Sequence, residues 1–328
     1  MTPSSVLIHG GGLAGVTFGW ALHRRGVPFR IVDEHRVVTS SKIAAGLMTP
    51  ITGKRLNESH RWREFFPVAV EFYRWVEVQL ACTVFVPKSI IRLFTSEAEA
   101  GRLDRSSDLV SSATPPELPD WVRVPFGAFE MPSAGQLRVR DYVEKSLLYF
   151  DTLPECQPDV TIWCEGYRPD PTSHFASVPM RPAKGEILTV RLPGIVDQHV
   201  FNCGGFWLTQ HVVYTYHFGA TYSWDQLDCV PTAVGRAELE ARFRQMVSVP
   251  FEVVDHQAAV RPIAVGQRPK LGLHPKDPSQ GYFNGLSSKG ALLAPYYANM
   301  LADALLGRGG IEDDVNVATV LPGSHPHP

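Results

Sequence analysis

The feature that most constrains the fold lies near the N-terminus, where a cluster of glycines separates an apolar run from a helix-forming segment. The apolar run Val6–His9 predicts a buried strand, Leu13–Arg25 predicts a helix, and Phe29–Val32 predicts a second strand. A strand, a glycine turn, a helix and a parallel strand within about 30 residues make a right-handed βαβ unit. We therefore expect an α/β protein with a parallel sheet at its centre.

The glycines of this unit have the spacing G-x-G-x-x-G, at Gly10, Gly12 and Gly15. The first permits a tight turn, the second lets backbone approach a pyrophosphate, and the third lets the helix pack on the strand. Asp33 follows the second strand, where a carboxylate can accept hydrogen bonds from a ribose, and Glu34 is the neighbouring candidate. The unit predicts a nucleotide cofactor without distinguishing NAD from FAD, and a purely structural glycine turn is the alternative.

Composition narrows the class of protein further. The chain has 328 residues, 44% of them hydrophobic and 20% charged, with a formal net charge of -2, as in ordinary globular proteins. This near-neutral charge argues against a broad nucleic-acid-binding surface, and no apolar run approaches the ~18 residues that span a bilayer. The first predicted strand begins at Val6, which leaves no room for a signal peptide, so a cytoplasmic location is expected.

The metal-binding and disulfide signals are weak. The five cysteines are widely spaced with no CxxC, and they are interpreted as free thiols. His199, His211 and His256 do not fall at metal-ligand spacing with other donors, so no metal site is predicted.

The rest of the chain alternates helical and β-rich patterns. Residues 111–135 are rich in Pro, Ser and Gly and are interpreted as a loop, and Pro87 is expected to interrupt the strands of Val84–Ser96. An amphipathic pattern predicts a helix over Arg61–Ala81, with Pro67 in or near its first turn. Further strands are predicted at Val160–Cys164, Lys184–Leu192 and Tyr214–Tyr222, and further helices at Ala233–Val247 and Ala291–Leu306.

Short segments in a specific order carry a family resemblance. They are the glycine fingerprint, "SSKIAAGLMTP", "PAKGEILTV", "FGATY", and the closing "RP" and "GLSSKGALLAP". Together they resemble the D-amino-acid oxidase superfamily of FAD enzymes, in particular its glycine-oxidase-like members. The "GLSSKG" loop is also similar to that of the oxidoreductase domain of a bacterial tRNA wobble-uridine modification enzyme.

The resemblance implies a Rossmann-like FAD-binding domain with a β-rich substrate lobe. The FAD-binding domain would comprise residues 1–80, 156–190 and 258–312, the lobe 81–155 and 191–257, and residues 313–328 would form a disordered tail. The implied activity is oxidation of the C–N bond of a small amine or amino acid, with hydride passing to FAD.

The same resemblance implies a set of site residues. Arg261, in the "RP" dipeptide, would bind a substrate carboxylate, which suits the planar fork of a guanidinium; the alternative is an arginine paired with a structural acid. Lys289 would add positive charge beside the flavin, or be an ordinary solvated lysine. The implied cofactor-binding residues are Gly10, Gly12, Leu13, Ala14, Gly15, Asp33, Glu34, Ser41, Ala45, Gly46, Met48, Gly166, Gly285, Ser287, Ser288, Lys289, Gly290 and Ala291.

The start of the helix that follows "GLSSKG" also has a role that physical chemistry predicts without the family resemblance. Gly285–Gly290 is expected to be a flexible loop whose amides form the positive start of an apolar helix. Such a helix start beside a flavin stabilises its anionic reduced ring.

Tyr214, Tyr216 and His217 are weaker candidates for lining the substrate pocket. For each of them alone, a place in the core or at an interface is the preferred interpretation.

Two departures from the family pattern leave other functions open. Family members place a β-meander before the strand at Val160, where this chain has only "FDTLPECQPD", and Ser288 stands where the family often has a second arginine. One alternative is therefore a degraded homologue that binds a dinucleotide without catalysis. Another is a flavoenzyme acting on an aminomethyl-modified tRNA nucleotide. The oligomeric state is not predicted.

Overall fold

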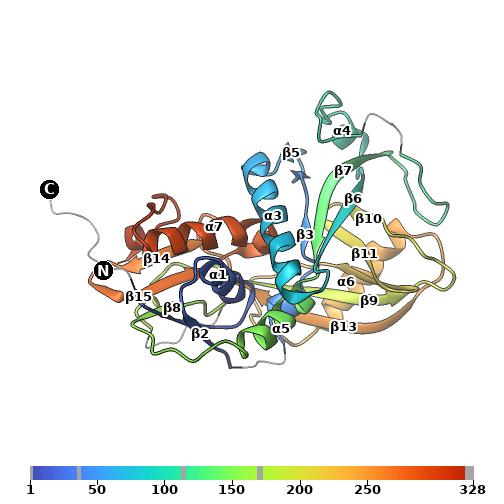
Figure 1. Ribbon diagram of the computed structural model, residues 1–328. Coiled ribbons are helices and arrows are strands. Elements are labelled where there is room, and N and C mark those ends of the chain that lie inside the picture. The colour runs from blue at the N-terminus through green and yellow to red at the C-terminus, as the bar shows by residue number, and fades with distance from the viewer. Residues whose placement is uncertain (1–2, 35–37, 112–115, 168–172, 322–328) are drawn as a thin grey trace.

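The computed structural model describes residues 3–34, 38–111, 116–167 and 173–321. A five-stranded sheet and an eight-stranded sheet form its two halves, with helix α3 between them (Figure 1). The α/β fold with a β-rich lobe that the sequence predicts is confirmed.

The five-stranded sheet is the nucleotide-binding-type half. Its order is β14 (Lys270–His274), β15 (Asp277–Asn284), β8 (Val160–Trp163), β1 (Val6–His9) and β2 (Phe29–Val32). All neighbours are parallel except β14 and β15. The strands predicted for β1 and β2 have the observed bounds.

Helices α1 (Leu13–His23) and α7 (Gly290–Leu305) lie against this sheet and pack on each other. Helix α3 (Trp62–Leu80) packs on α7. Eight of the eleven residues of α1 are buried, among them Phe18 and Trp20 with no exposed surface. A helix that is apolar on nearly every side is stable only when neighbours cover it all round, as here.

The eight-stranded sheet builds the other half. Its core contains Leu188 and Phe218 from the sheet and Phe243 from helix α6 (Ala233–Met246). The strand order is β13 (Glu252–Arg261), β9 (Ala183–Arg191), β12 (Thr215–Gly219), β11 (Phe206–Val212), β10 (Val200–Cys203), β6 (Phe85–Leu93), β7 (Ala128–Leu137) and β3 (Leu47–Met48).

Small elements complete the fold. They are α2 (Ser40–Ile43), α4 (Glu97–Ala100), α5 (Val139–Phe150), the hairpin of β4 (Ile51–Thr52) with β5 (Asn57–Glu58), and the 3-10 turns η1 (Ser287–Lys289) and η2 (Val317–Val320). Helix α5 contacts α1 and β2 of the first half, although its residues were assigned to the lobe. The domain boundaries themselves stay a prediction.

One of the two expectations about prolines is wrong. Strand β6 continues through Pro87, which pairs with Gly135 of β7. The other neighbour, β10, pairs with β6 only from Ile90 onward, so at Pro87 that side of the strand needs no N–H donor. Pro67 lies near the first turn of α3, at the beginning of the second turn, in agreement with the expectation.

The loop predicted over residues 111–135 is also wrong in part. Its last third belongs to β7, whose residues Phe129 and Met131 are fully buried against β6. Pairing with a distant strand overrides the weak local preference of a segment that contains Pro132 and Gly135.

The C-terminal segment differs from the expected disordered tail as far as residue 321. Val315 and Val317 have no exposed surface, and the Leu271 N–H donates to the Val315 carbonyl at 2.9 Å. These contacts attach the segment to the outer edge of the five-stranded sheet, beside β14. Residues 322–328 lie outside the described residues.

Candidate functional site

One cavity of about 880 Å³ collects most of the residues that the sequence singled out. It lies where the carboxyl ends of β1, β2 and β8 face the end of β13, the usual place for ligands in open α/β sheets. Its lining includes Gly10, Gly12, Leu13, Ala14, Asp33, Glu34, Ser41, Ala45, Gly46, Met48, Gly166, Arg261, Ser287, Ser288, Lys289, Gly290 and Ala291. Gly15 and Gly285 are absent from that lining.

The turn between β1 and α1 requires glycine. Gly10 has a φ of 114°, and a Cβ there would lie 2.4 Å from the carbonyl oxygen of Cys164. Gly12 is the residue before α1, so the N–H groups of the helix start, which have no partner within the helix, face the cavity. One of them, the N–H of Leu13, donates to Ser41 Oγ at 3.0 Å.

The two predicted glycines outside the lining have structural roles. A Cβ on Gly15 would lie 1.9 Å from the carbonyl oxygen of Gly10, so glycine lets α1 approach the turn closely. Gly285 lies against Ala264, and its φ of 82° lets the chain turn from β15 into η1.

Acidic groups lie at the end of β2. Asp33 and Glu34 both line the cavity, and the N–H of Gly11 donates to Asp33 Oδ2. The two acids that the sequence analysis proposes for a ribose therefore lie beside the glycine turn, and their role stays a prediction.

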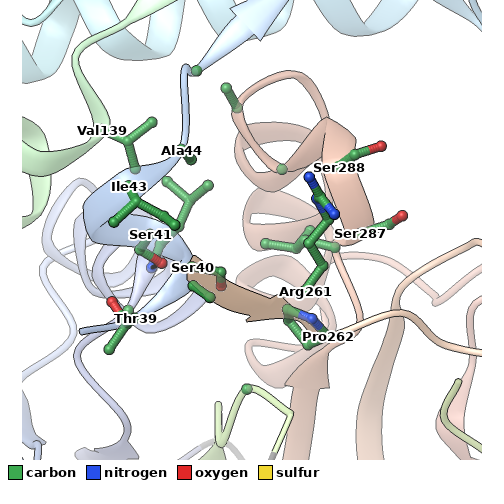
Figure 2. Close-up of a pocket in the computed structure, with 18 of the residues that line it drawn as sticks. Thr39, Ser40, Ser41, Ile43, Ala44, Val139, Arg261, Pro262, Ser287 and Ser288 are labelled. Atoms are coloured by element: carbon green, nitrogen blue, oxygen red, sulfur yellow. Dashed lines mark hydrogen bonds between the residues drawn. The ribbon is translucent and has the colours of Figure 1, made fainter. Parts of the chain in front are cut away.

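A wall of small residues forms the middle of the cavity. Gly46 has a φ of 67°, and its carbonyl accepts a hydrogen bond from the Leu137 N–H at 2.9 Å. The Ala45 carbonyl accepts another from Gln136 Nε2 at 3.0 Å. Figure 2 shows Ser41, Ile43 and Ala44 on one side of the cavity, opposite Arg261 and Ser288 on the other. The cavity therefore opens between a wall of small residues and a wall that carries Arg261 and Ser288.

The segment expected to be a flexible loop is instead a defined turn. Residues Ser287–Lys289 form η1, held by a hydrogen bond from the Ser287 N–H to the Pro262 carbonyl at 3.0 Å. A Cβ on Gly290 would lie 2.8 Å from the Leu13 side chain, so the starts of α7 and α1 lie close together. Their positive ends therefore face the same cavity.

Lys289 lies in this turn and lines the cavity. Its Nζ donates to Thr52 Oγ1 at 3.5 Å, and burial lowers the pKa of its ammonium group from the ordinary value. A partly buried ammonium with one distant hydroxyl partner is not the solvated lysine of the alternative interpretation.

Arg261 ends β13 and lies across the floor of the cavity. Its guanidinium is 4.8 Å from the centre of the Tyr222 ring, and NH1 donates to the Thr221 carbonyl at 3.3 Å. Burial lowers the pKa of Arg261 from its usual value. Within the described part of the chain no carboxylate forms an ion pair with it, which disfavours the alternative of a structural acid partner.

Several lining residues were not selected from the sequence. Gly185, Ile187, Trp207 and Tyr222 line the cavity around Arg261. Tyr222 belongs to the quoted "FGATY" segment, and the alternation of β9 was the signal available for Gly185 and Ile187.

The three weaker pocket candidates are not among the residues of the lining. Tyr216 is fully buried in the core of the lobe, while Tyr214 is 43% exposed on a hairpin. His217 stacks on His211 with ring centres 4.1 Å apart.

The connection before β8 is as short as the sequence implied. Described residues 151–159 contain no strand. They are held to the sheet by hydrogen bonds from the N–H and Oγ of Ser4 to Asp159 Oδ2 at 2.9 and 3.1 Å. The cavity therefore lacks the meander expected from the family resemblance.

Among residues whose structure is described, no three His, Cys, Asp or Glu side chains are grouped to hold a metal ion. In those same residues, no helix combines the length and apolar character needed to cross a bilayer.

No protein-family model matches the chain. Solved structures do match over almost its full length. Glycine oxidase from Geobacillus kaustophilus superposes with a TM-score of 0.79 at 20% identity, covering 99% of both chains. Iminodiacetate oxidase from Chelativorans sp. BNC1 gives 0.76 at 18% identity, over 95% of this chain and 98% of the other.

A third match is L-proline dehydrogenase from P. horikoshii, with a TM-score of 0.72 at 14% identity, covering 93% of each chain. At such identities the similarity shows a shared fold. The fold implied by the resemblance to glycine-oxidase-like proteins is therefore confirmed.

Proposed function

We propose that this chain is an FAD-dependent oxidoreductase that oxidises the C–N bond of a small amine or amino acid. The observation that carries the proposal is a single cavity that joins the amide-rich starts of α1 and α7 to the half-buried guanidinium of Arg261, which has no carboxylate partner among the described residues. Proteins of the same fold are named as glycine oxidase, iminodiacetate oxidase and proline dehydrogenase, which supports this class of reaction.

The residues present fit FAD. The N–H groups at the start of α1 suit a pyrophosphate, and Asp33 and Glu34 suit the hydroxyls of a ribose. The wall at Ala44–Gly46 suits a flat ring, because small side chains let backbone approach it. The turn Ser287–Lys289 with the start of α7 would supply N–H donors and positive charge to one edge of that ring.

FAD, when bound, supplies the acceptor for a hydride. The chain's own part is to bind and orient the substrate. Arg261 would hold the carboxylate through two parallel N–H donors, which fixes the direction of the neighbouring Cα. The guanidinium lies over the Tyr222 ring, and this cation–π contact restricts the movement of the arginine side chain.

The proposed site needs no side-chain base. The lining that the large sheet and its loops provide has no carboxylate or histidine among the described residues. The amine would therefore give its proton to water on binding, and the neutral amine is the form that can release hydride from its α-carbon.

The visible spectrum of the purified protein tests the proposal. We expect a flavin absorption band that bleaches without oxygen when one of a panel of amines and amino acids is added. Protein that is colourless and cannot be reconstituted with FAD would instead indicate the degraded homologue. A persistent flavin band that no amine bleaches would overturn the proposed reaction while keeping the cofactor.

A further inference from the structure

Strand β9 carries two buried charges that the proposed reaction does not use. Lys184 and Glu186 are 2% and 4% exposed, and they flank Gly185, which lines the cavity. Because successive residues of a strand face opposite sides, Gly185 faces the cavity and the two charged residues face away from it. Burying a charge is costly unless it is paired, so these side chains need an explanation.

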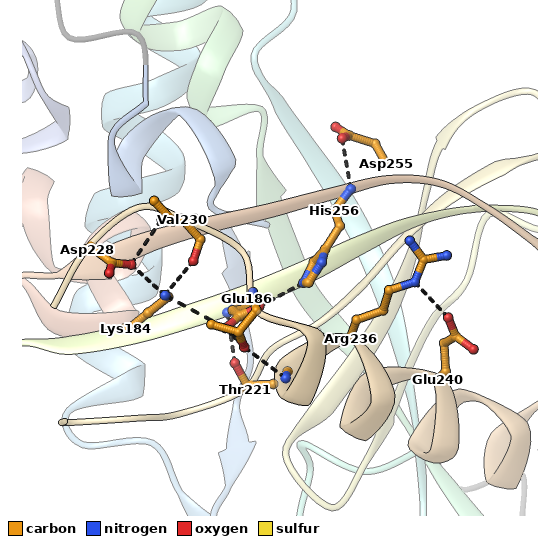
Figure 3. A network of polar contacts seen from close by, with 11 residues as sticks. Lys184, Glu186, Thr221, Asp228, Val230, Arg236, Glu240, Asp255 and His256 are labelled. Atoms are coloured by element: carbon orange, nitrogen blue, oxygen red, sulfur yellow. Dashed lines mark hydrogen bonds and ion pairs between the residues drawn. The ribbon is translucent and has the colours of Figure 1, made fainter. Parts of the chain in front are cut away.

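Both side chains bind the loop that follows β12, as Figure 3 shows. Lys184 Nζ donates to Asp228 Oδ1 at 2.6 Å and to the Val230 carbonyl at 2.5 Å. Glu186 accepts from the N–H of Thr232 at 2.9 Å and from its Oγ1 at 2.8 Å. The far end of this loop is therefore tied to β9 by charge-assisted hydrogen bonds, which are the stronger kind.

The near end of the loop is tied to the same strand. The N–H of Glu186 donates to Thr221 Oγ1 at 2.9 Å, and the N–H of Thr221 donates to the Glu186 carbonyl at 3.1 Å. Ser223 and Lys184 exchange two backbone hydrogen bonds. Tyr222 lies between these attachments and is thereby held beside Arg261.

Gly185 completes the arrangement on the other face. A Cβ at this position would lie 2.2 Å from NH2 of Arg261, so the guanidinium rests directly on the bare backbone of β9. Arg261 is then bounded by Gly185 below, by the Tyr222 ring and by the Thr221 carbonyl. Every one of these boundaries depends on β9 or on the loop tied to it.

We infer that Lys184, Gly185 and Glu186 are positioning residues for the carboxylate-binding arginine, the two charges acting through loop 221–232. This inference rests on the proposed function for the role of Arg261 in binding a carboxylate. Lys184 and Glu186 do not line the cavity, so they would act on how tightly a carboxylate binds rather than on the oxidation step.

The test compares Lys184→Met with Arg191→Met in the flavin-loaded protein. Arg191 lies on the same strand, and its exposed ion pair with Glu252 makes it the control. The probes are benzoate, whose binding is followed by the flavin spectrum or by calorimetry, and the amine substrate found in the panel.

Lys184→Met should raise the benzoate Kd and the substrate KM roughly 10- to 100-fold, since small misplacements of a binding group have effects of that size. Changes in kcat and in flavin content should stay within about 3-fold, and Arg191→Met should match the parent protein.

Asp228→Ala and Gly185→Ala serve as further variants. The side chain of Asp228 is 48% exposed, so its loss should not prevent folding, yet it should raise Kd and KM in the same direction as Lys184→Met. Gly185→Ala leaves the polar contacts in place and should displace the guanidinium directly.

The inference would be overturned if Lys184→Met and Asp228→Ala bound benzoate as tightly as the parent protein does. A lower thermal midpoint in these variants would then show that the network only stabilises the fold. A wild-type protein that binds benzoate but oxidises no amine would count against the proposed function alone, because the comparison of benzoate affinities still decides the inference.

Discussion

The start of α7 lies against the start of α1, where a Cβ on Gly290 would be 2.8 Å from the side chain of Leu13. These residues are far apart in the chain, yet they place two positive helix ends at one cavity. A ligand with negative or electron-accepting groups spaced along its length would meet both ends at once. This arrangement underlies the proposal of a flavin dinucleotide.

Arg261 gives the most direct prediction. Arg261→Leu should raise KM for a carboxylate substrate by about 30-fold or more, because the loss of a desolvated charged hydrogen-bonding group costs about 2–5 kcal/mol. Flavin content should not change. Steady-state kinetics and the flavin-to-protein absorbance ratio check both points.

Arg261→Lys should recover only part of that loss, since an ammonium cannot offer two parallel donors. Equal KM values in the parent protein and the Leu variant would remove Arg261 from the substrate site.

Gly10 gives a prediction about cofactor binding. Gly10→Ala should strongly reduce flavin retention, because its Cβ would overlap the Cys164 carbonyl at 2.4 Å in the turn that faces the cavity. Gly26→Ala is the matched control, since Gly26 also has a positive φ, of 67°, but nothing lies within 4 Å of a Cβ there. The Kd for FAD, measured on protein stripped of flavin, distinguishes them. Flavin affinity in Gly10→Ala equal to that of Gly26→Ala would contradict the prediction.

His217 gives a prediction about acid stability. Burial lowers its pKa to about 4 from 6.5, with smaller contributions from His211 and Arg140. Above pH 6.5 neither the folded nor the unfolded form binds the proton. As the pH falls from 6.5 toward 4, only the unfolded form binds it, so the folded state loses stability.

His217→Gln should therefore lose less stability than the parent protein between pH 7 and pH 5, measured by urea midpoints. His174→Gln is the control, because the His174 side chain is 46% exposed. An unchanged pH dependence in the His217 variant would contradict the prediction.

The packed C-terminal segment gives a prediction about folding stability. Val317→Ala should lower the free energy of unfolding by roughly 1.5–3 kcal/mol, because it removes two buried methyl groups and leaves a small cavity. Val196→Ala, at a side chain 58% exposed, should change it by less than about 0.5 kcal/mol. Chemical denaturation of both variants would show whether the segment belongs to the cooperative fold.

The parts of the structure that the sequence predicted are those with a local signal. The βαβ unit at Val6–Val32 follows from glycine spacing and apolar periodicity within one continuous stretch. The strand at Ala128–Leu137 was missed because Pro132 and Gly135 have weak β-propensity, and only pairing with β6 makes the strand.

The same distinction holds for the site. Arg261 and Lys289 carry charges whose chemistry suggests a role, and both line the cavity. Gly185 offers no functional group, and its importance appears only when the Arg261 side chain is seen lying on it. The place of Tyr222 in the cavity could not be predicted from the sequence, because it depends on the direction in which the chain turns after β12.

Successive side chains of β9 face opposite sides of the sheet, and this limits which sequence changes the protein can tolerate. An insertion or deletion of one residue just before Lys184 would exchange the two faces of the strand, turning a charged side chain into the ligand space and the glycine away from it. Variation in length is therefore expected to be excluded from this strand and confined to loops elsewhere. Libraries that seek new substrates should keep its length fixed and vary side chains only.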